Sequence, residues 1–158
     1  MNYILNSETV NGLNHLISRN NDAANGFVEV SNNVNYPNLT QWLIDWAKVH
    51  EQNKVNLKSI IENGDGEATS GTSFLGELHH AWIDLKAQFT NNDTAALLDE
   101  CLTGQEKAIK DYEEVLAIKG MPSFVQNMVK EQKDELKESM KSLNFLKSSY
   151  KKIENVPS

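Results

Sequence analysis

Apolar side chains recur every three or four residues along most of the chain, and no long stretch alternates apolar and polar residues as a half-buried strand does. Helix breakers interrupt this pattern at Pro37, at residues 63–66 (Asn-Gly-Asp-Gly) and at residues 120–122 (Gly-Met-Pro). The periodicity therefore predicts long helices joined by breaks, with one shorter helix among them. The predicted ranges are residues 8–34, 38–62, 74–89, 94–118 and 123–150.

The lengths of the connections predict how these helices are arranged. The first and last links are short, so the helices on either side of each should be antiparallel neighbours. The middle connection is long, because it holds a Gly-, Ser- and Thr-rich stretch from 64 to 73 and then the short helix. Two helical hairpins joined by one long crossover are the ferritin-like arrangement. The expected fold is all-α: one ferritin-like four-helix bundle over residues 1–158, whose crossover carries a short fifth helix.

Composition and charge indicate which kinds of partner the protein is not expected to bind. The 158 residues carry a formal net charge of −7, which disfavours binding to nucleic-acid phosphates or to anionic lipid. No apolar run approaches the roughly 18 residues that span a bilayer. A single cysteine, Cys101, excludes an internal disulfide framework. The N-terminal residues lack the features of a signal peptide. We therefore expect a cytoplasmic protein with neither a nucleic-acid nor a membrane partner.

One segment carries a long motif. Residues 71–86 read GTSFLGELHHAWIDLK, which resembles the Ser-Phe-Leu-Gly-x-Leu-His-x-x-Trp-x-x-Leu-Lys motif of a family of uncharacterised, ferritin-like bacterial proteins. That family is sometimes described as stress-inducible. Residues 100–101 (Glu-Cys), Gly104 and residues 112–114 (Tyr-Glu-Glu) also match its pattern, and so does the stretch from 13 to 27. The resemblance implies the bundle fold, but this family has no settled function.

A metal centre is the chemistry that such bundles commonly hold. Di-iron bundles use a carboxylate from each of two helices and a Glu-x-x-His pair from each of the other two. None of the predicted long helices carries that pair: Ala47 stands three residues before His50, and the last helix has no histidine. The resembling family has Gly-Glu where this chain has Gly104 and Gln105. An amide is a poorer ligand than a carboxylate for a hard cation, and it brings no charge to offset that cation.

Polar residues nevertheless fall on the apolar stripes of the long helices. We expect these residues to form a neutral, hydrogen-bonded layer at the bundle centre, with His50 uncharged because burial disfavours the imidazolium. The layer consists of Asn20, His50, Asn53, Gln105 and Gln132. The alternative is an iron or manganese site built from His50 and nearby carboxylates. Its candidate carboxylates are Asp22, Glu51, Glu106 and Glu135.

Two functions follow from these alternatives. The favoured one is a non-catalytic bundle protein that acts through a protein partner or by self-association, for example as a homodimer. For such a protein we expect no catalytic and no cofactor-binding residues. The second is a metal-binding ferritin-like protein, of the oxidoreductase or storage type, with a non-standard site. The amide at Gln105 and the missing Glu-x-x-His pairs on the long helices favour the first.

Overall fold

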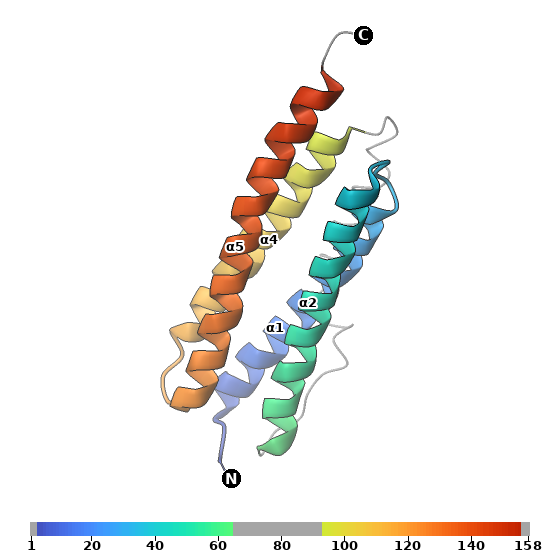
Figure 1. Ribbon diagram of the computed structural model, residues 1–158. Helices are drawn as coiled ribbons and strands as arrows, with labels where there is room; N and C mark the ends of the chain where they lie inside the picture. Colours follow the sequence, from blue (N-terminus) through green and yellow to red (C-terminus); the bar gives the residue numbers. More distant parts are fainter. Residues whose placement is uncertain (1–2, 65–92, 156–158) are drawn as a thin grey trace.

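The computed structural model describes residues 3–64 and 93–155, and within them every regular element is a helix. The helices are α1 (Ser7–Ser31), α2 (Pro37–Asn63), α4 (Thr94–Leu116) and α5 (Ser123–Glu154) (Figure 1). This confirms an all-helical bundle and the four long helices predicted from the sequence. The predicted helix at 74–89, together with the motif at 71–86 and the crossover itself, lies outside the described residues.

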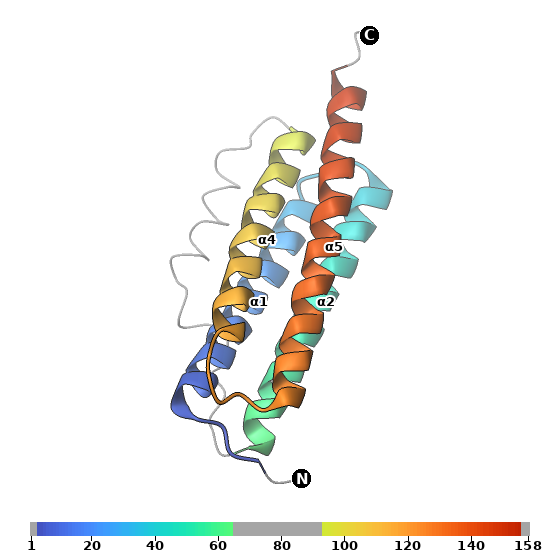
Figure 2. The ribbon, with the colours of Figure 1, turned by 90° about the vertical axis from the view of Figure 1, so that its left-hand side faces the viewer.

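The helices form two antiparallel pairs, α1 with α2 and α4 with α5 (Figures 1 and 2). The first pair packs onto the second mainly through α1 and α4, whereas α2 and α5 touch each other far less. Between the four helices, the described residues form two apolar clusters. One contains Leu13, Leu16 and Val125, and the other contains Phe27, Leu43 and Leu143. None of the described helices is long and apolar enough to cross a membrane.

Helix α1 ends three residues earlier than the periodicity predicts. It begins after Asn6, whose side chain accepts a hydrogen bond from the Thr9 backbone N–H at 2.8 Å. At the other end, the Asn33 side chain donates to the Glu29 carbonyl at 2.7 Å, which satisfies a carbonyl that a continuing helix would have used. Val34 is still buried. Its apolar spacing therefore predicted its burial correctly, but the predicted end of the helix was wrong.

Helix α5 extends four residues beyond its predicted end at 150, because Glu154 is held in place. Its carboxylate accepts hydrogen bonds from the Thr94 backbone N–H at 3.1 Å, the Thr94 hydroxyl at 2.7 Å and the Tyr36 hydroxyl at 2.9 Å. A negative charge at the N-terminus of α4 is favourable, since the unpaired N–H groups there carry partial positive charge. The contact ties the end of α5 to the start of α4 and to the α1–α2 link.

Candidate functional site

All five polar residues predicted for the bundle centre are buried. Asn20 comes from α1, His50 and Asn53 from α2, Gln105 from α4 and Gln132 from α5, and none is more than 5% exposed. Each occupies a position on the otherwise apolar stripe that its helix turns toward the interior. Buried polar atoms need partners, so the hydrogen bonds among these side chains determine what the site is.

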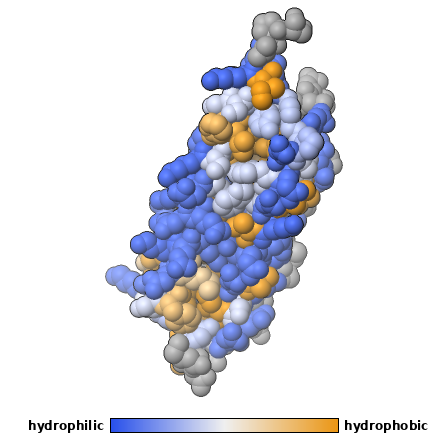
Figure 3. Space-filling view, in the orientation of Figure 1, coloured by the Kyte–Doolittle hydropathy of each residue, from blue (hydrophilic) through white to orange (hydrophobic). Residues whose placement is uncertain are grey.

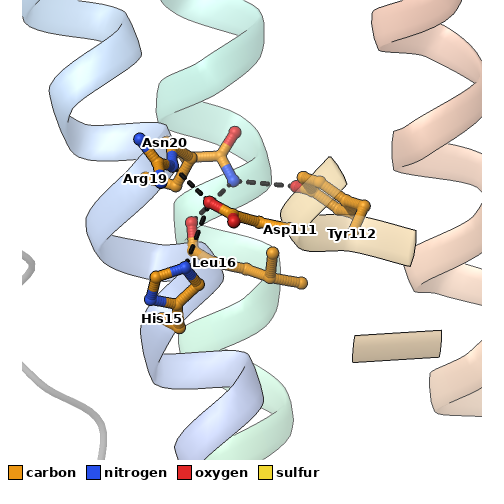
Figure 4. A network of polar contacts seen from close by, with 6 residues as sticks. All are labelled: His15, Leu16, Arg19, Asn20, Asp111 and Tyr112. Carbon is orange, nitrogen blue, oxygen red and sulfur yellow. Dashed lines mark hydrogen bonds and ion pairs between the residues drawn. The ribbon is translucent and has the colours of Figure 1, made fainter. Parts of the chain in front are cut away.

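Asn20 is the hub of the layer. Its Nδ2 donates to the Leu16 carbonyl and to the Tyr112 hydroxyl, each at 2.8 Å (Figure 4). The other side-chain atom, Oδ1, lies 2.8 Å from Nδ1 of His50. Since Oδ1 can only accept, His50 carries its proton on Nδ1 and donates it to Asn20. The hydrogen bonds of Asn20 therefore fix the tautomer of His50.

The chain of hydrogen bonds continues across the bundle. The Tyr112 hydroxyl donates to Oε1 of Gln132 at 2.6 Å, and Nε2 of Gln132 donates to the Asn53 carbonyl at 3.4 Å. The chain thus links all four described helices, with every donor pointing the same way along it. Tyr112, which is fully buried on α4, is not among the residues that the sequence predicted for this layer. The available signal was its hydroxyl, because a buried tyrosine O–H usually finds a partner.

Gln105 lies beside the ring of His50 and is hydrogen-bonded to α5. Its Nε2 donates to the Ser139 hydroxyl at 2.7 Å, and that hydroxyl donates to the Leu136 carbonyl at 2.6 Å. The Gln105 carbonyl is left beside the His50 ring. Neither Oε1 of Gln105 nor Nε2 of His50 has a hydrogen-bond partner among the described residues, as expected of two acceptors placed side by side.

The layer is uncharged at neutral pH. Burial lowers the pKa of His50 from 6.5 to about 4, and the adjacent Gln105 side chain partly opposes this lowering because its carbonyl favours the protonated ring. Burial likewise raises the pKa of the Tyr112 hydroxyl. At pH 7 the site therefore offers amides, a neutral imidazole and hydroxyls. Such a set can fix the register of the helices, but it brings no negative charge to a cation.

The structure does not gather the candidate carboxylates around His50. Asp22 is buried on α1, whereas Glu51, Glu106 and Glu135 are exposed. Glu51 instead forms an ion pair with Lys54, with Oε2 and Nζ 2.9 Å apart. Among the described residues, no group of three or more His, Cys, Asp and Glu side chains is placed to hold a metal ion.

One Glu-x-x-His spacing does occur in the chain, at Glu77 and His80. It belongs to the segment between α2 and α4 and lies outside the described residues. The four long helices carry no such pair, and a metal site that uses Glu77 and His80 is therefore tested separately.

A second polar cluster lies on the seam between α1 and α4. Asp111 Oδ2 accepts from the Arg19 Nε–H and lies 3.0 Å from Nε2 of His15 (Figure 4). Burial alone would raise the pKa of Asp111, but the hydrogen bonds and charges of His15 and Arg19 together outweigh it and hold the pKa below its ordinary value. None of these three residues is among the site residues predicted from the sequence. The spacing of His15 and Arg19, one helical turn apart, was the usable signal.

The fold and this site define an all-helical bundle with a buried polar layer. The chain belongs to the family described as a domain of unknown function, DUF2383, whose model matches residues 8–119. No curated protein matches the chain.

Proposed function

We propose that this chain is a non-catalytic, ferritin-like bundle protein that acts through a protein partner or by self-association. The observation that supports the proposal is the hydrogen-bonded chain from His50 through Asn20 and Tyr112 to Gln132. It fills the bundle centre with neutral groups whose donors and acceptors are mostly matched. Bringing two divalent ions into this centre without matching anions would cost many kcal/mol.

The finer parts of the proposal rest on other observations. The order of two antiparallel pairs, with a long connection between α2 and α4, agrees with a ferritin-like topology. The motif at 71–86 supports a role in stress, as in the family that it resembles. The acidic charge supports a protein that binds neither nucleic acid nor anionic membrane. We further propose that the protein is cytoplasmic.

Metal analysis tests the proposal directly. Protein purified without chelator is incubated aerobically with ferrous iron, and separately with manganese, then desalted and assayed for metal. We expect far less than one metal ion per chain. About two iron atoms per chain would overturn the proposal and establish the metal-binding alternative.

Two matched variants locate any metal that does bind. His50→Gln removes the only buried imidazole of the described layer, and His80→Gln removes the histidine of the Glu77–His80 pair. Loss of iron in His50→Gln alone would place the ion in the bundle centre. Loss in His80→Gln alone would place it in the connecting segment.

A further inference from the structure

A groove runs between α2 and α5 near the end of the bundle where α2 finishes and α5 begins. It consists of two adjoining hollows that share Asn56, Phe124 and Met128. We call it the α2–α5 groove. Its α2 wall includes Asn53, Asn56 and Ile60, and its α5 wall includes Phe124, Met128 and Glu135.

The groove exists because these two helices pack loosely against each other, unlike the other neighbouring pairs. Tyr3 lines its outer end. The Tyr3 hydroxyl donates to the Ile60 carbonyl, and its ring meets the Phe124 ring edge to face with centroids 4.8 Å apart. These contacts hold Tyr3 against both helices, so its side chain closes this end of the groove.

Apolar surface is exposed in the groove. Phe124 is 39% exposed, although a ring of this size is usually covered. Figure 3 shows hydrophobic atoms gathered toward the lower end of this face, where α2 ends and α5 begins in Figure 1, with a hydrophilic band above them. An exposed apolar patch with a polar rim is typical of an interaction site.

The charge of the groove has one sign. Glu131 and Glu135 line it, and no Lys or Arg is among the described residues that do. Lys54, on the same stretch of α2, instead donates to Asn21 of α1 and pairs with Glu51. The electrostatic complement of this surface is therefore a basic one.

An unused donor lies at the base of the groove. Asn53 is 5% exposed, and its Nδ2 has no hydrogen-bond partner among the described residues. Beside it, Gln132 spans the two helices by donating to the Asn53 carbonyl. A buried amide N–H without a partner is costly, and an acceptor supplied from the groove would remove that cost.

We infer that the α2–α5 groove binds a basic amphipathic helix of a partner protein, an inference that rests on the partner-dependent function proposed above. The apolar face of that helix covers Phe124 and Met128, and its Lys or Arg residues meet Glu131 and Glu135. The stretch of α2 from 53 to 63 is roughly 15 Å long, which matches about three turns of a bound helix. A second copy of this chain is a poorer occupant, because its net charge of −7 would repel the groove.

Peptide binding to the full chain tests the inference. The probe is a fluorescent helix of about fourteen residues, roughly four turns, with Leu on one face and Lys on the other. Two control peptides accompany it: one has Glu in place of Lys, and the other has the same composition in an order that destroys the amphipathic face. Fluorescence anisotropy should show saturable binding of the Leu/Lys probe alone. Equal binding of the shuffled peptide, or no binding of the probe, would overturn the inference.

Matched variants separate the groove from general acidity. The double change Glu131→Gln and Glu135→Gln should weaken probe binding about tenfold or more, because both groove carboxylates are lost. Glu113→Gln with Glu114→Gln removes the same charge from an exposed part of α4 and should change binding less than about twofold. Equal losses in the two double variants would show nonspecific attraction and refute the groove.

An apolar variant completes the test. Phe124→Ser should also weaken binding of the probe. Circular dichroism of the variant checks that the bundle stays folded. If the chain takes up no iron and does not bind the probe, the inference about the groove is wrong but the proposed function still stands. If the chain takes up about two iron atoms, the proposed function is wrong, whether or not the peptide binds.

Discussion

In the part of the chain that the structure describes, two polar clusters have central residues that are neighbours in the sequence. Asn20 and Tyr112 belong to the central layer, while Arg19 and Asp111 belong to the seam between α1 and α4 (Figure 4). One residue along a helix turns the side chain by about 100°, so the same two helices present one pair inward and the other sideways. The inward pair is at most 1% exposed, whereas the seam pair has side chains 12% exposed.

This difference in burial decides which chemistry each cluster uses. At the centre, where water is excluded, the groups are neutral, and even the histidine has its pKa lowered to about 4. On the seam, a carboxylate stays ionised because Arg19 and His15 meet the same oxygen. A difference in burial thus separates a network held by matched donors and acceptors from one held by charge.

The largest effect should come from removing the hub of the central layer. Asn20→Leu keeps the approximate volume but leaves the His50 Nδ1–H without its acceptor and removes one of the two hydrogen bonds of the Tyr112 hydroxyl. An unpaired buried group costs about 1–3 kcal/mol and a lost hydrogen bond about 1 kcal/mol, so we expect a loss of roughly 2–4 kcal/mol in the free energy of unfolding. Urea denaturation measures it. A loss below about 1 kcal/mol would show that the layer does not act as one network.

The free energy of unfolding at acidic pH should depend on His50. Its pKa is 6.5 when exposed and about 4 when folded, so between these values the unfolded chain binds a proton that the folded chain does not. Stability therefore falls as the pH drops from 6.5 to 4. At about 1.4 kcal/mol per pKa unit, the loss is roughly 3 kcal/mol.

Denaturation at several pH values gives this slope, and His50→Gln should flatten it between pH 6.5 and 4. The ring resonances of His50 in NMR spectra give a direct check. A folded-state midpoint near 6.5 would contradict the prediction, because it would mean that the ring is hydrated.

The sequence was sufficient for the parts of this comparison that depend on helical phase alone. Periodicity located α1, α2, α4 and α5, since each turns one stripe toward a common centre. It also marked Asn20 and His50, because amide and imidazole groups stand out among apolar neighbours. Tyr112 was missed because its ring suits an apolar stripe while its hydroxyl does not. Asp111 was missed because its partners lie 92 and 96 positions away, and periodicity within one helix carries no information about such pairs.

The seam cluster should be less sensitive to change than the centre. Asp111→Asn keeps the shape but removes the charge opposite Arg19, and we expect a loss of about 1–2 kcal/mol at pH 7, between exposed and fully buried ion pairs. The pKa of Asp111 is lowered from its ordinary 3.8, so its contribution is complete above that value and is lost as the pH falls through the folded pKa. Denaturation of both proteins at pH 7 and below pH 3 should show the difference shrink. A difference that persisted in acid would mean that shape, not charge, is responsible.

The smallest effect should come from the same carboxylate-to-amide change on the outer surface. Asp99 on α4 accepts from Lys147 on α5 at 2.6 Å, which is a shorter contact than that of His15 with Asp111. The two side chains are 55% and 36% exposed, so water screens the pair and both groups stay hydrated when it breaks. We expect Asp99→Asn to change the free energy of unfolding by less than about 0.5 kcal/mol. Measured beside Asp111→Asn in low and high salt, it makes the same side-chain change at an ion pair that is more exposed to water. A loss equal to that of Asp111→Asn would contradict the prediction, because it would show that exclusion of water does not set the strength of these pairs.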